Sequence, residues 1–177
     1  MSDMNNKIKT MRSIIGYCLL LPFIQCWGGD NVPVHVTGAV TGSPCTISND
    51  SVQQTIDLGH DISNLSLKNP GSSTDWVTFN INLEACPEAT KTVFMSAHGT
   101  SDDDNPADMY KNTGDATNVA VQVQSQTGEA LGDGKTLKGT IINNAYSYKL
   151  RARIYTQKGK PGPGEVSASM TVTFEYQ

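Results

Sequence analysis

Residues 166–177, VSASMTVTFEYQ, alternate between apolar and polar side chains up to the last residue. In a β-strand successive side chains point to opposite faces, so this pattern predicts a strand with one buried face. The polar face consists of serine, threonine and glutamate. The apolar face consists of Ala168, Met170, Val172, Phe174 and Tyr176.

The same alternation recurs upstream. Residues 75–86, DWVTFNINLEAC, place Val77, Phe79, Ile81 and Leu83 on one face, and shorter alternating segments lie at residues 43–49, 53–59, 91–99, 118–126 and 145–157. The stretches between them are rich in Gly, Pro, Asn and Asp and predict turns or loops, above all at residues 66–75, 100–116, 127–136 and 158–165. Short strands separated by turns, without a long helical stretch or an internal repeat, predict an all-β sandwich.

The first 28 residues predict a secretory signal peptide. A basic segment with Lys7, Lys9 and Arg12 precedes the apolar residues 13–24, which are too few for the roughly 20-residue span of a membrane helix. We expect cleavage after Gly28, because small residues stand at positions 26 and 28. The alternative is a lipoprotein signal acylated at Cys26, although Gln25 fits a lipid-attachment site poorly.

Without residues 1–28 the formal charge changes from −4 to −6, with 10 basic and 16 acidic residues. Nucleic-acid binding needs clustered Lys and Arg for the phosphates, so this composition argues against a nucleic-acid partner. The mature chain contains no further apolar segment long enough to cross a membrane.

Two cysteines remain after residue 28, Cys45 and Cys86. In an exported protein an even pair predicts a disulfide, which here would stabilise the fold by roughly 4 kcal/mol in the chain-entropy model. Metal binding is the alternative, but the chain has no C-x-x-C motif, and its three histidines stand far apart.

Two charged clusters have two interpretations each. Asp102, Asp103, Asp104 and Asp108 form either a solvated loop or a Ca²⁺ site, although the spacing of an EF-hand is absent. The basic residues Lys149, Arg151 and Arg153 form either a solvated sheet face or a contact surface for an acidic neighbour. The sequence shows no nucleophile elbow or phosphate-binding loop, so we expect no enzyme, cofactor or metal.

Residues 31–40, NVPVHVTGAV, form another alternating strand at the start of the mature chain, with Val32, Val34 and Val36 on one face. Gly38 and Val40 continue that face. Gly38 suits either a shallow pocket approached closely by backbone or a simple kink before Cys45. Pro33 cannot donate a ladder hydrogen bond, which weakens pairing at the outer end of the strand.

Taken together, these motifs resemble the pilin subunits of chaperone–usher fimbriae of the type 1 family, over nearly all of residues 30–177. The resemblance rests on the alternating N-terminal arm, on SPCTIS and LEACP around the two cysteines, on YKNTGDATNVAVQVQSQTGEAL at residues 110–131, and on TVTFEYQ at the end. Residues 110–131 look most like a minor tip or adaptor pilin, although major pilins share part of them.

The resemblance implies an incomplete immunoglobulin-like β-sandwich that lacks its final strand and is completed by donor-strand complementation. Residues 1–28 would be the signal, residues 29–43 a donor-strand extension and residues 44–177 the pilin domain. The donor strand would present Val32, Val34, Val36, Gly38 and Val40. The groove and C-terminal strand would comprise Ala168, Met170, Val172, Phe174, Tyr176 and Gln177, with the terminal carboxylate held by basic residues of a chaperone.

The implied function is that of a structural subunit in an adhesive fimbria, which takes part in cell adhesion. Its partners would be a periplasmic pilus chaperone, an outer-membrane usher and neighbouring pilins, and the chain would pass through the periplasm to the cell-surface fimbrium. Two alternatives stay open: a major rod pilin of the same fibre, and a secreted carbohydrate-binding β-sandwich that is complete as a monomer.

Overall fold

The computed structural model describes residues 44–177. The predicted signal peptide and donor strand, including Val32, Val34, Val36, Gly38 and Val40, lie outside the described residues. The structural statements below concern residues 44–177.

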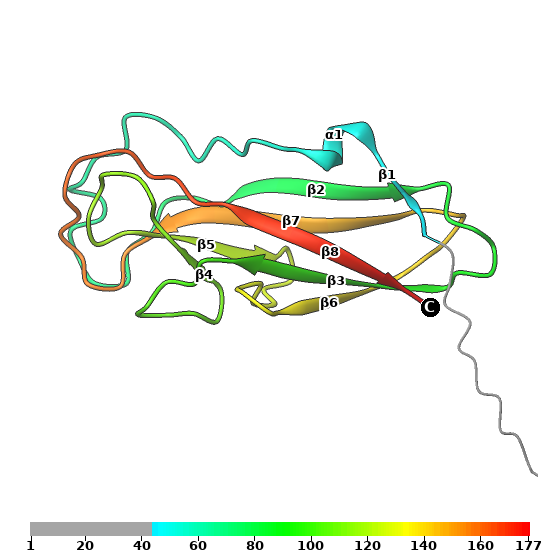
Figure 1. Ribbon diagram of the computed structural model, residues 1–177. Coiled ribbons are helices and arrows are strands. Elements are labelled where there is room, and N and C mark those ends of the chain that lie inside the picture. Colours follow the sequence, from blue (N-terminus) through cyan, green and yellow to red (C-terminus); the bar gives the residue numbers. More distant parts are fainter. Residues whose placement is uncertain (1–43) are drawn as a thin grey trace, which may run out of the picture. The chain divides into compact units, whose positions relative to one another are not determined.

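Residues 44–177 form two antiparallel sheets that face each other (Figure 1). The larger sheet has the strand order β1-β2-β7-β5-β4, and the smaller one has the order β6-β3-β8. The strands are β1 (Thr46–Ile47), β2 (Val77–Glu84), β3 (Thr92–Gly99), β4 (Met109–Lys111), β5 (Ala120–Ser125), β6 (Thr136–Thr140), β7 (Tyr146–Tyr155) and β8 (Met170–Tyr176). The predicted all-β sandwich is confirmed.

The single helix of the described region, α1 (Asn49–Val52), has four residues. No helix in residues 44–177 has the length and hydropathy that a membrane crossing requires.

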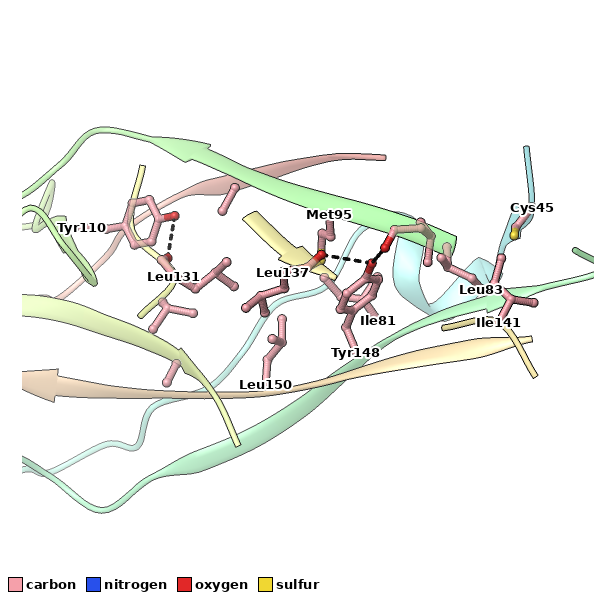
Figure 2. Close-up of a cluster of buried hydrophobic side chains, with 14 of the residues drawn as sticks. Cys45, Ile81, Leu83, Met95, Tyr110, Leu131, Leu137, Ile141, Tyr148 and Leu150 are labelled. Carbon is pink, nitrogen blue, oxygen red and sulfur yellow. Dashed lines mark hydrogen bonds between the residues drawn. The ribbon is translucent and has the colours of Figure 1, made fainter. Parts of the chain in front are cut away.

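The core lies between the sheets, and Figure 2 shows part of it. The alternation predicted for β2 and β7 is confirmed, because the apolar side of each strand contributes to this core. Leu83 of β2, Leu150 of β7 and Met95 of β3 are at most 1% exposed. Burial of side chains of this size contributes roughly 1.5–3 kcal/mol each to stability, so the interleaved faces hold the two sheets together.

Two tyrosines are buried in this core. The Tyr110 hydroxyl donates to the carbonyl oxygen of Leu131 at 3.0 Å, and the Tyr148 hydroxyl donates to that of Val93 at 3.0 Å. Burial is the main cause that raises the pKa of Tyr110 to about 12, and burial also raises the pKa of Tyr148. Both hydroxyls therefore stay protonated, as donors, well above the pH at which an exposed tyrosine ionises.

This burial predicts a loss of stability in alkali. An unfolded tyrosine ionises near pH 10, whereas folded Tyr110 keeps its proton to about 12, so between these values the unfolded state releases the proton first and is favoured. The unfolding temperature, followed by circular dichroism, should therefore fall as the pH rises from 10 to 12. This fall in unfolding temperature should be smaller in Tyr110→Phe than in the unaltered protein. In Tyr155→Phe, which changes a tyrosine outside the core, it should be as large as in the unaltered protein. An equal fall in Tyr110→Phe would contradict this cause.

Three expectations for the strands were wrong. Residues 53–59 are not a strand, because α1 interrupts the pairing of β1 with β2 after two positions and no backbone ladder to β2 resumes behind it. The stretches predicted as turns at residues 100–116 and 127–136 contain β4 and the start of β6, respectively. β4 is too short for a pattern, and one of the two inward residues of β6 is Gly139, so neither strand shows an apolar alternation in the sequence.

Asp108 is also placed differently from the expectation of a solvated acidic loop. Its side chain is 6% exposed, and its Oδ2 accepts hydrogen bonds from Gln122 Nε2 at 2.7 Å and Gln124 Nε2 at 2.6 Å. Asp103 and Asp104 instead form ion pairs with lysines on the surface. The four aspartates therefore do not act as one group, and residues 44–177 contain no cluster of three potential metal ligands.

The basic residues of β7 lie on the outer face of the larger sheet. The guanidinium carbons of Arg151 and Arg153 lie 4.2 and 4.1 Å from the centroid of the Trp76 ring. Each arginine also donates to a glutamine of β5, and burial lowers the pKa of Arg153. Stacking and hydrogen bonding thus hold both side chains against the sheet, while Lys149 is exposed.

Candidate functional site

The last strand, β8, has one partner among the described residues. It pairs along its full length with β3, and its other edge has no strand beside it in residues 44–177. Gln177 and Thr92 exchange both backbone hydrogen bonds, so the odd-numbered residues of this ladder bond to β3. The N–H and C=O groups of the even-numbered residues therefore point to the open edge.

These even-numbered residues are also the apolar ones, and they are incompletely covered. Met170, Val172, Phe174 and Tyr176 face the core but remain half-buried. By contrast, Leu150 and Ile154 on the inner face of β7 are 0% and 5% exposed. One row of β8 residues thus presents both unpaired backbone groups and uncovered apolar side chains. A neighbouring β-strand would satisfy both.

An open groove of about 1610 Å³ runs along this edge. Its floor includes Phe79 and Ile81 of β2, Val121 and Val123 of β5, and Ala152 and Ile154 of β7. One wall is β8 together with the residues before it, from Val166 and Ala168 through Met170 and Val172 to Phe174. Ala168 precedes the strand but continues its alternation of burial.

The other wall is the segment at residues 53–62, whose half-buried side chains are Ile56, Leu58 and Ile62. Its residues 53–59 are those that the sequence predicted as a strand. It is held near β2 by side-chain bonds, such as the one from Gln54 Nε2 to the Asn80 carbonyl oxygen at 2.8 Å. Both walls therefore carry apolar side chains, and the groove between them has the form of a site for one more strand.

Tyr176 and Gln177 lie at one end of the groove and do not line it. Burial raises the pKa of Tyr176, while a hydrogen bond from the backbone of Cys45 acts in the opposite direction. The backbone oxygen of Gln177 accepts from the N–H groups of Lys91 at 2.9 Å and Thr92 at 2.8 Å. These contacts fix the C-terminal end of β8 beside the start of the described chain.

The predicted disulfide between Cys45 and Cys86 is confirmed, with a Cα–Cα distance of 4.1 Å. It lies at the same end as Tyr176 and fixes the start of the described residues beside the end of β2. Of the predicted groove residues, Ala168, Met170, Val172 and Phe174 line the groove and Tyr176 and Gln177 do not, whereas the floor and the wall at residues 53–62 were not predicted. Sequence alternation reports which residues face the core but not whether the core is covered.

Comparison with known proteins agrees with this geometry. The family model described as "Fimbrial protein" matches residues 34–177. Protein FimG of Escherichia coli K12 is 30% identical over 148 residues, covering 82% of this chain and 85% of that protein. A type-1 fimbrial protein A chain of Escherichia coli is 34% identical over 186 residues, covering 97% of this chain and 100% of that protein.

Among solved structures, the P pilus rod subunit PapA superposes with a TM-score of 0.64 at 21% sequence identity, covering 76% of this chain and 100% of that one. At this identity the superposition supports the fold alone, which is an immunoglobulin-like sandwich that lacks a strand. The family is one of structural subunits and is not enzymatic. The chain therefore belongs to the fimbrial protein family, as a pilin of the chaperone–usher type.

Proposed function

We propose that this pilin assembles by donor-strand exchange. Its groove beside β8 receives a strand from another protein, and its own residues 31–40 fill the groove of a neighbouring subunit. The observation that carries the proposal is the row of Met170, Val172 and Phe174, whose half-buried side chains line the groove and whose backbone groups point to the open edge. Adding a strand to an exposed edge supplies main-chain bonds, and pockets for alternate side chains supply specificity.

The donor strand in this proposal comes from residues 29–43, after removal of residues 1–28. Val32, Val34, Val36, Gly38 and Val40 form its inward face, and residues 44–177 are the pilin domain. Each buried valine contributes roughly 1.5–3 kcal/mol. Gly38 provides the position where backbone comes closest to the groove.

A subunit with an open groove exposes both an unpaired strand edge and apolar surface, and this combination favours aggregation. We therefore propose that a periplasmic chaperone covers the groove first, binding β8 and the terminal carboxylate of Gln177. An outer-membrane usher then exchanges the chaperone for the next subunit's arm, and the product is a cell-surface fimbria. From residues 110–131 we propose a minor or adaptor position in the fibre; tagging the subunit and locating it by electron microscopy would separate this position from that of a major rod pilin.

Deleting residues 29–40 tests the donor role. The truncated subunit should still form a complex with its chaperone, because its groove is intact, but it should not join the subunit that it normally completes. Affinity purification of the periplasmic complex and electron microscopy of fibres measure the two steps. Normal fibre incorporation of the truncated chain would show that the arm is not the donor.

Expression without the chaperone distinguishes this function from that of a carbohydrate-binding sandwich that is complete as a monomer. Residues 29–177, expressed alone in the periplasm, should aggregate or be degraded without the chaperone. A stable monomer in that experiment would favour the carbohydrate-binding alternative.

A further inference from the structure

Five apolar residues lie on the surface at the end of the sandwich that carries the disulfide, beside polar residues such as Glu88 and Asn143. We call these five residues the end surface: Pro44, Ala85, Pro87, Ala89 and Ile142. Ile142 is 67% exposed, Pro87 is half-buried, and the other three residues are exposed. Ile142 is one of three large apolar side chains that residues 44–177 leave exposed, with Val52 and Leu65, and it is the one whose turn is hydrogen-bonded to Cys86.

The end surface is held together by covalent and hydrogen bonds. The disulfide joins Cys45 to Cys86, the Cys86 N–H donates to the Asn144 carbonyl oxygen at 2.9 Å, and Asn144 Nδ2 donates to the Cys86 carbonyl oxygen at 2.7 Å. Asn144 belongs to the tight turn between β6 and β7, in which Ile142 pairs with Ala145. The turn that presents Ile142 is therefore fixed beside the point where the described chain begins.

Two residues of this turn explain its rigidity. Asn143 and Asn144 have φ angles of 53° and 61°, the left-handed region that a two-residue hairpin of type I′ requires at both central positions. Asparagine adopts this region more readily than most residues. The side chain of Ile142 is thus displayed by a well-defined turn rather than by a long loop.

The short length of chain between the proposed donor strand and Pro44 indicates what covers this surface. Only residues 41–43 separate Val40, the last inward position of the proposed donor strand, from Pro44. Four fully extended residue steps span at most about 14 Å. A subunit that holds Val40 in its groove must therefore lie directly against the end of the sandwich that carries the disulfide.

We propose that the end surface is the docking site for the fimbrial subunit that receives this chain's donor strand, with Ile142 as the apolar anchor of the contact. The proposal rests on the donor-strand function proposed above. It adds a body-to-body contact beside the inserted strand, which limits how freely consecutive subunits tilt. The partner is another pilin, and its contacting residues must include an apolar patch that covers Ile142.

Site-specific photocrosslinking in purified fibres tests the contact. A photoreactive benzoylphenylalanine at position 142 of the full chain should capture an adjoining fimbrial subunit, identified by mass spectrometry. The matched control places it at Gln126, an exposed residue in the turn after β5, away from the end surface. Capture at position 142 should exceed capture at position 126 about tenfold. Equal capture, or capture of the chaperone without a fimbrial subunit, would overturn the proposal.

A second variant separates contact from insertion. With the photoreactive residue at Asn143, Ile142→Asp should lower capture about tenfold, which corresponds to about 1.4 kcal/mol, while incorporation into fibres stays unchanged. Gln126→Asp adds the same charge and should leave capture unchanged. Undiminished capture in Ile142→Asp would overturn the anchor role. A chain absent from fibres in every variant would instead overturn the donor-strand function and this contact with it.

Discussion

Fusing residues 31–40 behind Gln177 through a four-residue turn is expected to raise the unfolding temperature of residues 44–177 by more than about 10 °C. The added strand would lie antiparallel beside β8, where a short hairpin turn suffices. Its backbone would pair with the open N–H and C=O groups of Met170, Val172 and Phe174. Its valines would cover the apolar side chains that are now half-buried, at roughly 1.5–3 kcal/mol each.

The face of the fused strand provides the control. Val34→Asp in the fused copy should remove most of the gain, because it places a carboxylate in a groove lined by apolar residues such as Ile81 and Val123. His35→Asp places the same carboxylate at the next position, on the opposite face, and should cost little. Thermal unfolding of the three proteins measures the difference.

Two results would contradict the open groove. The first is that residues 44–177 alone are as stable as the fused protein. The second is that Val34→Asp and His35→Asp lower the unfolding temperature of the fused protein equally. The first result would mean that the sandwich is already complete without a borrowed strand. The second would mean that the strand adds stability without seating a particular face in the groove.

The sequence predicts the long strands well because each has enough positions for its alternation to stand out. β2, β7 and β8 have 8, 10 and 7 residues, and each turns toward the core the face that the pattern assigned to it, although that face of β8 is only half-buried. β4 has only 3 residues, so its sequence shows no alternation. Asp108, next to β4, is buried and accepts hydrogen bonds from two glutamines of β5 that are brought near it only when the sheet has folded.

The groove, unlike the long strands, could not be predicted from the alternation of side chains. The alternation of β8 is the same whether its apolar face is fully covered or half-exposed, so the sequence pattern alone could not show that a strand is missing. The family resemblance supplied that expectation, and the unpaired edge of β8 is now visible in the structure. The wall at residues 53–62 could not be predicted, because an alternating segment held by side chains looks like a strand.

Removing the disulfide should lower the stability of residues 44–177 strongly. In the chain-entropy model a bridge between residues 41 apart contributes about 4 kcal/mol, which corresponds to a fall of roughly 10–20 °C in the unfolding temperature of a domain this size. Cys45→Ala combined with Cys86→Ala keeps the buried sites apolar, since the two residues are only 8% and 1% exposed. Thermal unfolding of the fused protein, with and without the bridge, measures the loss.

Removing the disulfide should also destabilise one wall of the groove. β1 pairs with β2 only at Thr46 and Ile47, so we expect the bridge to help restrain the chain that continues into the wall at residues 53–62, together with hydrogen bonds of Ser48 and Ser51 with Asn82. Without it, that wall should exchange its amide hydrogens faster, while β3 and β7 in the middle of their sheets should remain protected. Reduction of the unaltered protein should reproduce both effects. Equal exchange of residues 53–62 with and without the bridge would show that side-chain bonds such as the one from Gln54 hold the wall by themselves.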